Sequence, residues 1–315
     1  MGARLTQPIR SRASSSQLTL SRRIAPPLYG GWALAMFCCG RGLAQEDSPL
    51  QEVDIQAQRQ TALESQALAI SETPNAGPHL LHPYVIIGLG PLIAPAYDGS
   101  MNTKVSPFLY LDVRGLFNDR VFVSDLEGIG VKLLNDGAVR AGLTVNYARG
   151  RTSSDDPHLK GLPDIGGAAQ VGGYLAYVFR PFAIETKVGH RLGSTSGTQV
   201  SIAASVSAAP TQHFHISLSA DVNWADARYQ QTFFGVTAAD AAQATAAGNP
   251  LPAYTPGSGL TSVGMVAAGV YQVGDHWGLV ARIGFHDLLG TSVKDSPLTQ
   301  RTFQPNFAVG AMYKF

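Results

Sequence analysis

Charged residues and long apolar runs are both scarce in this chain of 315 residues. Only 14% of the residues are charged, whereas soluble proteins carry about a quarter. No apolar run approaches the roughly 18 uninterrupted residues of a transmembrane helix. A mean hydropathy of +0.04 also lies far below that of a helical membrane protein. Low charge, 34 Gly residues and middling hydropathy suit strands that face lipid on one side and water on the other.

Cysteine is scarcer still, and both cysteines lie in the N-terminal segment. An apolar stretch over 28–39 follows an arginine-rich region and ends in Gly42-Leu43-Ala44, with small residues at the −3 and −1 positions. This pattern predicts a signal peptide over residues 1–44 that is cleaved after Ala44. Cleavage removes both cysteines, so the mature chain can form neither a disulfide nor a cysteine metal site.

Three other interpretations of this segment fit less well. A membrane anchor needs a longer apolar run. The pair Arg22-Arg23 is typical of twin-arginine signals, but Ala25 and Pro26 follow where bulky apolar residues are wanted. A lipid-attachment cysteine normally follows a small residue, whereas Phe37 precedes the first cysteine.

Cleavage also changes the charge balance. Residues 1–44 hold 6 of the 23 Lys and Arg residues and none of the 22 Asp and Glu residues, which leaves 17 against 22 and a net charge of −5. An acidic mature chain argues against nucleic-acid binding, which needs a basic surface. Residues 45–82 are polar and interrupted by prolines, and they predict a flexible periplasmic extension with a short helix over 53–70.

From residue 83 to residue 315 the hydropathy alternates with a period of two. In 214–224, for example, Phe, Ile, Leu, Ala, Val and Trp alternate with His, Ser, Ser, Asp and Asn. Such alternation predicts strands with one apolar face, of the length that crosses a bilayer when tilted. The expected strands are 83–91, 103–113, 119–125, 127–134, 138–148, 167–179, 180–191, 197–209, 212–225, 260–272, 277–287 and 304–315.

The connections between these strands alternate between short and long. If the first strand runs outward, the short connections around 135–137, 180–181, 210–211 and 274–276 all face the periplasm. The long polar connections over 149–166, 226–259 and 288–303 then lie outside. The sequence therefore predicts an all-β fold, an antiparallel transmembrane β-barrel of about 12 strands with short periplasmic turns and longer extracellular loops.

The last strand carries a distinct signal, because its alternate apolar residues end on a terminal aromatic side chain. The alternating positions are Phe307, Val309, Ala311, Tyr313 and Phe315. This arrangement resembles the signal by which the barrel-assembly machinery recognises outer-membrane proteins. A soluble edge strand could match it only by accident.

The opposite face of the strands looks into the barrel and carries ionisable groups of both signs. These inward charges are Asp112, Arg140, Glu185, Lys187, Asp221 and Arg282, with His215 and Lys314 on the same face. Charged groups inside a membrane protein face water or one another. They can therefore lock the interior as a structural network or line a narrow aqueous path.

Catalysis has little support in the sequence. Asp155, Asp156 and His158 share one outer loop, but the loop is rich in Ser and Asp, where solvated charge is the default. His213 and His215 have no third ligand at metal spacing. No G-x-S-x-G nucleophile motif occurs. We therefore expect a chain without catalytic residues, metal or cofactor.

Several segments resemble the MipA/OmpV family of outer-membrane proteins. The resemblance covers about 84–315 and is carried by the segments 94–100, 150–156, 159–165, 229–236, 254–259, 295–298 and 313–315. It implies a non-enzymatic barrel in outer-membrane lipid that acts as a scaffold between a murein transglycosylase and a murein synthase. Other members resemble adhesins, and a small-solute channel is a further alternative. The N-terminal extension is longer than in the shortest members.

Overall fold

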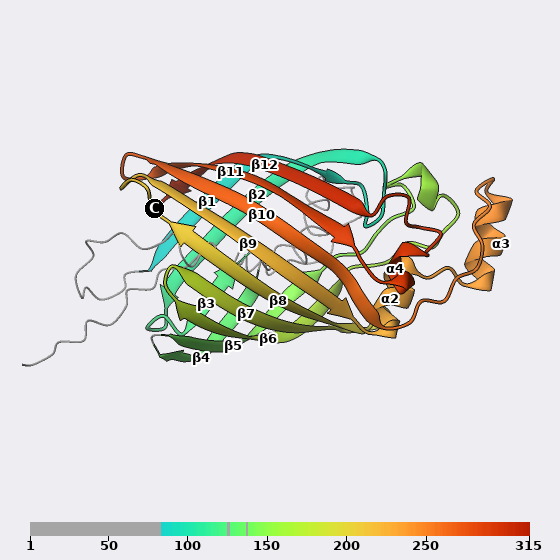
Figure 1. Cartoon of the computed structure of the whole chain (residues 1–315), viewed down its shortest axis with the longest axis horizontal. Helices are drawn as coiled ribbons and strands as arrows, with labels where there is room; N and C mark the ends of the chain where they lie inside the picture. Colours follow the sequence, from blue (N-terminus) through green and yellow to red (C-terminus); the bar gives the residue numbers. More distant parts are fainter. Residues whose placement is uncertain (1–82, 125–126, 137) are drawn as a thin grey trace, which may run out of the picture.

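A computed structural model describes residues 83–124, 127–136 and 138–315. The predicted signal peptide over 1–44 and the predicted extension over 45–82 lie outside these described residues. The described chain forms one closed antiparallel sheet in which each strand pairs with its sequence neighbours and β1 pairs with β12. The twelve-stranded barrel predicted from the sequence is thus confirmed (Figure 1).

The observed strands lie close to the predicted ones. They are β1 (Tyr84–Pro95), β2 (Thr103–Leu116), β3 (Val121–Ser124), β4 (Gly128–Asp136), β5 (Val139–Ala148), β6 (Ala168–Phe179), β7 (Phe182–Arg191), β8 (Gly197–Ala208), β9 (Phe214–Ala225), β10 (Gly259–Val273), β11 (Trp277–Leu288) and β12 (Phe303–Lys314).

Strand β3 is shorter than the predicted 119–125, and β2 is correspondingly longer. The cause is the turn between them, where Phe117, Asn118 and Asp119 have φ angles of 50°, 59° and 61°. Residues in this left-handed region cannot continue a strand. The sequence contains no glycine at these three positions to signal such a turn.

The outward face of the barrel wall is apolar, and most of its polar residues face inward. On β9, Leu218 and Val222 are each 42% exposed, whereas Ser219 is 2% exposed and Asp221 is 1% exposed. Ile283 on β11 is 63% exposed between the buried Arg282 and Gly284. This reversal of the usual burial pattern is what a strand needs when one face contacts hydrocarbon.

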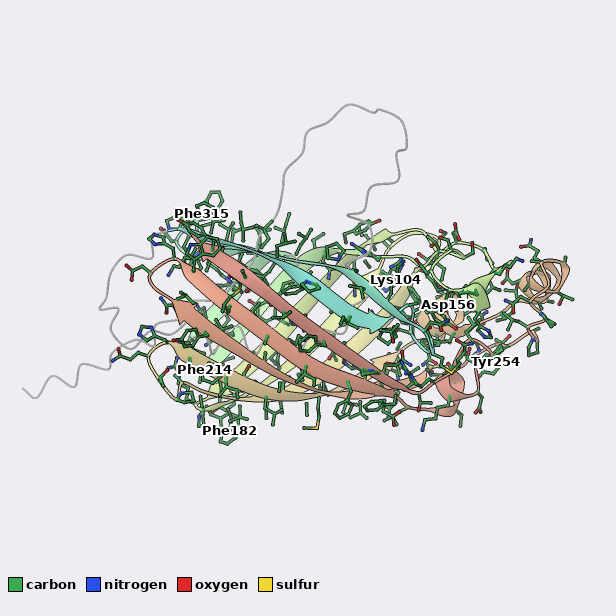
Figure 2. The ribbon with its side chains drawn as sticks, turned by 90° about the horizontal axis from the view of Figure 1, so that it is seen from above. Lys104, Asp156, Phe182, Phe214, Tyr254 and Phe315 are labelled. Atoms are coloured by element: carbon green, nitrogen blue, oxygen red, sulfur yellow. The ribbon has the colours of Figure 1, made fainter. Side chains whose placement is uncertain are left out.

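The two ends of the barrel differ from each other in the connections that they carry. The connections 117–120, 180–181, 209–213 and 274–276 and the C-terminus lie at one end, which we name the turn end. The helices and the longest connections lie at the other, the loop end (Figure 1). Phe182, Phe214 and Phe315 lie toward the turn end, opposite Asp156 and Tyr254 (Figure 2). This sorting of short and long connections is the one expected for a transmembrane barrel.

The long connections are folded rather than extended loops, which the sequence analysis did not predict. They contain α2 (Ala227–Phe234), α3 (Ala238–Ala246), α4 (Thr291–Lys294) and a 3₁₀ turn over Pro157–Leu159. None of the described helices has the length and apolar character to cross a membrane.

Candidate functional site

The segments that carry the family resemblance assemble at the loop end of the barrel. They lie in or beside the four connections 96–102, 149–167, 226–258 and 289–302, which we call the cap. Only the C-terminal segment 313–315 belongs to the turn end. Residues spread over some 200 positions of sequence therefore form one structural unit.

The cap has an apolar core of the kind found in soluble proteins. Its members are Tyr97, Leu159, Leu162, Val236, Ala244, Leu251 and Leu298. A second cluster of Phe234, Leu288 and Val293 joins α2 and α4 to the rim of the barrel. Because every one of the four connections contributes a residue to the first cluster, no connection can move without exposing apolar surface.

Local capping signals begin the two longer cap helices. The Asp226 carboxylate accepts the backbone N–H of Tyr229 at 2.8 Å at the start of α2. At the start of α3, Thr237 and Asp240 form a capping box, in which each side chain accepts the other residue's backbone N–H. Each cap satisfies N–H groups that the helix itself leaves unpaired.

Hydrogen bonds between distant connections fasten the cap. The Tyr97 hydroxyl donates to the Leu298 carbonyl at 2.8 Å, and the Ser296 hydroxyl donates to the Phe234 carbonyl at 2.6 Å. Arg151 Nη1 donates to the Phe233 carbonyl at 2.9 Å. Burial raises the pKa of Tyr97, and the nearby Asp156 raises it further. The Tyr97 hydroxyl therefore keeps its proton and remains a donor.

Asp155, Asp156 and His158, which lie together in the sequence, have structural partners. Asp156 accepts hydrogen bonds from the Ser100 hydroxyl at 2.7 Å, from Asn102 Nδ2 at 3.1 Å and from the His158 backbone N–H at 2.8 Å. Asp155 pairs with Lys104 at 3.5 Å.

His158 is engaged on a separate connection. Its Nε2 donates to the Pro297 carbonyl at 2.9 Å. Asp156 and His158 thus bond to different parts of the cap rather than to each other's side chains, and both join connections together.

One interior cluster of charges crosses the barrel near the turn end. Arg114 contacts Asp112 at 3.5 Å and Glu127 at 3.4 Å, and Lys187 contacts Glu127 at 3.5 Å and Glu185 at 3.3 Å. Strands β2 and β7 are far apart around the barrel, and Glu127 bridges them through its two oxygens. A buried carboxylate with two cationic partners is fixed in position.

A second interior group surrounds Asp221 on β9. Asn223 Nδ2 donates to Asp221 Oδ2 at 2.5 Å and to Ser262 Oγ at 3.1 Å. His286 Nε2 lies 3.7 Å from Asp221 Oδ1, and both side chains are fully buried. Strand register places Gly264 between Asp221 and His286, and the missing side chain leaves the room for this approach.

The remaining predicted inward residues also lie on the interior face. Arg140 and Glu185 are on either side of Ala176 in the strand register, and Arg282 lies between Ala268 and Ala308. His215 is buried, whereas Lys314 is exposed at the turn end. The structure adds Arg114, Glu127 and His286 to the predicted group. Arg114 could have been found from its register, because it lies two residues beyond Asp112.

The C-terminal strand carries its apolar face outward along its whole length. Phe307 is 42% exposed, Val309 40% and Phe315 67%, and Ala311 and Tyr313 share this face. Tyr313 lies between the rings of Trp277 and Phe315, with centroid distances of 5.0 Å and 4.8 Å. Strand β12 pairs with β11 on one side and with β1 on the other, and so closes the barrel.

Metal binding has no support in the part of the chain that is described, since no group of three or more His, Cys, Asp and Glu residues is placed to hold an ion.

The closed sheet, the lipid-facing apolar belt and the terminal aromatic strand define a transmembrane β-barrel of the outer-membrane class. Within that class, the family model described as "MltA-interacting protein MipA" matches residues 87–315. The chain belongs to this family, and the resemblance inferred from the sequence segments is confirmed. A search of curated proteins gave no match.

Solved structures with similar barrels are distant in sequence. An outer membrane channel from Pseudomonas putida F1 is 13% identical, with a TM-score of 0.39, over 77% of this chain and 98% of that one. OmpT of Vibrio cholerae with loop L8 deleted is 9% identical, with a TM-score of 0.34, over 74% and 98%.

The N-terminal barrel domain of Pseudomonas aeruginosa OprF is 12% identical, with a TM-score of 0.22, over 47% of this chain and 88% of that one. The strand pairing of this chain establishes its own fold, and no function is transferred from these structures.

Proposed function

We propose that this chain is a non-enzymatic outer-membrane scaffold that binds a murein transglycosylase and, together with it, a murein synthase. Membership of the MltA-interacting protein family over 87–315 is the observation that carries the proposal, because MltA is a murein transglycosylase. A scaffold needs a rigid surface and no catalytic groups, which suits a barrel whose ionisable residues are taken up by structural contacts.

The turn end would face the periplasm, where murein enzymes work, and the cap would face outward. Short turns on the periplasmic side are the rule for bacterial barrels. A tag inserted at the exposed Ala246 in the cap should then be labelled in intact cells, whereas a tag at Asp136 at the turn end should not. Labelling at Asp136 would reverse the orientation.

Buried interior charges support a scaffold over a small-solute channel. Asp112 is 0% exposed, Glu185 3% and Arg282 3%, whereas an open aqueous path would wet such groups. The cap, fastened across four connections, also covers the loop end. We therefore expect small solutes to pass poorly, and general porins with wide channels usually have more strands.

Affinity capture from crosslinked envelopes tests the proposal. The two candidate contact regions are the turn end and the extension 45–82, which we expect to be the main docking element. Phe117→Asn removes a 79% exposed aromatic residue from the turn end, and Met101→Asn removes a 60% exposed apolar residue from the cap as a matched control. Asn tolerates the positive φ angle at position 117.

We expect capture of a murein transglycosylase by the parent protein and by Met101→Asn. Loss with Phe117→Asn would assign the contact to the turn end, and loss only on removal of 45–82 would assign it to the extension. Large, stable conductance in planar bilayers, with no murein enzyme captured, would contradict the scaffold and favour a channel. If the cap is labelled in intact cells, the protein binds host surfaces and no murein enzyme is captured, the result would favour an adhesin.

A further inference from the structure

Arg282 is an interior charge that neither cluster contains. Its side chain lies on the interior face of β11 and is 3% exposed. Within the described part of the chain, Nε and Nη1 of its guanidinium have no hydrogen-bond partner. The carboxylate of Asp221 interacts electrostatically with the guanidinium of Arg282, but its two oxygens lie against Asn223 and His286.

A guanidinium buried in this way carries a large energetic penalty unless an anion accompanies it. Arginine does not lose its proton under ordinary conditions, so it cannot escape the penalty by becoming neutral. A buried charge without a partner is among the most destabilising features a fold can contain. The site is therefore built for a negatively charged group.

Two other partnerless polar atoms lie on β12, which pairs with β11, and on β9, which is separated from β11 by β10. Ser217 Oγ on β9 is buried, and Ser217 is next to Ala268, which is next to Arg282 in the register. Asn306 Oδ1 on β12 is also buried, and Asn306 pairs with Gly284, two residues along β11 from Arg282. The serine hydroxyl can donate to an anion beside the arginine, whereas the amide oxygen of Asn306 can only accept a hydrogen bond from a neutral O–H or N–H group.

The residues beside Arg282 in the strand register are small. Ala268 and Ala308 flank Arg282 in its row, and Gly284 lies in the next row. Ala308 also belongs to an apolar cluster with Leu92 and Phe108 on the interior wall. A ligand that carries a carboxylate and a hydroxyl or amide N–H group, and that has one apolar face, matches this combination of surfaces.

We propose that Arg282 and Ser217 form a carboxylate-binding site inside the barrel, with Asn306 Oδ1 beside it as the acceptor for an O–H or N–H group of the same ligand. The planar fork of arginine matches the two oxygens of a carboxylate. The site is independent of the proposed scaffold role, since it uses no residue at either end of the barrel.

The carboxylate has two possible sources. One is a free acidic solute. The other is this chain itself, because the segment 45–82 contains six acidic residues and one basic residue and joins β1, which begins at the turn end with Tyr84. A stretch of 38 residues spans at most about 125 Å when extended, so its length does not limit access.

Binding of D-glucuronate to the folded full-length protein tests the site, measured by isothermal titration calorimetry with D-glucose as the neutral control. Four proteins are compared: the parent, Arg282→Gln, Arg228→Gln and a variant in which all six acidic residues of 45–82 become amides. Arg228→Gln removes one positive charge from the exposed surface of α2. Heat-dependent gel mobility verifies that each variant is folded.

If a free solute is the source, the parent binds glucuronate but not glucose, and Arg282→Gln weakens binding by about tenfold or more. If the chain supplies the carboxylate, the parent binds weakly and the six-amide variant gains glucuronate binding, which Arg282→Gln then removes. Arg228→Gln changes neither result. Absence of Arg282-dependent glucuronate binding in both the parent and the six-amide variant would overturn the proposal.

Discussion

The barrel wall and the cap place their apolar side chains in opposite ways: the wall exposes them and the cap buries them. In the wall, Leu218 and Ile283 face outward and Asp221 and Arg282 face inward. In the cap, Leu159 and Leu298 are fully buried, as in a soluble domain. The difference follows from the surroundings, because the wall meets hydrocarbon and the cap meets water.

The two regions also depend on different interactions for their stability. The wall combines backbone pairing around a closed sheet with interior ion pairs, whereas the cap combines an apolar core with side-chain bonds to distant carbonyls. Damage to one region should therefore leave the other largely intact. Four variants test this separation, in order of expected effect.

The largest effect is expected at the end of β12. Replacing both Tyr313 and Phe315 with Ser should prevent insertion into the membrane, because it removes the aromatic boundary from the strand that closes the barrel. Heat-dependent gel mobility of outer-membrane fractions measures insertion. Tyr271→Ser, at a 50% exposed aromatic on β10, is the control. If the double variant is inserted normally, the terminal strand is not the assembly signal.

The next effect is expected in the interior cluster. Arg114→Met leaves Asp112 and Glu127 without their shared cation, and removal of one partner of a buried ion pair costs about 3–5 kcal/mol. Urea-induced unfolding in lipid vesicles measures the loss. Arg120→Met, at an exposed position of the adjacent turn, should change stability little. Equal effects of the two variants would mean that the interior pairs add nothing specific.

A smaller and local effect is expected in the cap core. Leu298→Ala removes a fully buried side chain and should destabilise the cap by about 2–5 kcal/mol. Limited proteolysis of whole cells should then cleave the cap faster while the barrel keeps its heat-dependent mobility. Leu279→Ala, at a 53% exposed lipid-facing position, is the size-matched control. Loss of barrel mobility in Leu298→Ala would show that the two regions unfold together.

The smallest effect concerns the Tyr97 hydroxyl. Tyr97→Phe removes one buried hydrogen bond and should weaken the cap by about 1 kcal/mol. Burial raises the pKa of Tyr97 in the folded state, so its contribution is complete below the ordinary tyrosine pKa of about 10 and is lost as the pH rises above it. Proteolysis of the cap should therefore accelerate at high pH in the parent and less in Tyr97→Phe.

The alternating residues of the strands were enough to predict the barrel. A period of two fixes which residues face lipid, and a change of one residue in register would turn every apolar side chain inward. For this reason the strand count and the inward positions of Asp112, Glu185 and Asp221 follow from the sequence. The end of β2 and the shortness of β3 do not, because Phe117 is not a residue type that signals a positive φ angle, although Asn118 and Asp119 beside it are typical of turns.

Only separate parts of the cap could have been predicted from the sequence. Thr237 and Asp240 could have indicated the start of α3, since their spacing is that of a capping box. The contact between Tyr97 and Leu298 joins positions 201 residues apart and depends on the barrel bringing β1 and β12 together. No local pattern contains that information.

The sequence by itself therefore determined the strands, their lipid face and the terminal aromatic strand, because each is a repeating local pattern imposed by the membrane. Only the tertiary structure decided which interior charges are paired. Lys187 reaches Glu127 across the barrel, whereas Arg282 is separated from Asp221 although both lie on the same interior face. Whether two interior charges form an ion pair depends on how the sheet closes and on the stagger between its strands. It also depends on the small residues that lie between the charged side chains. All of these are properties of the whole barrel.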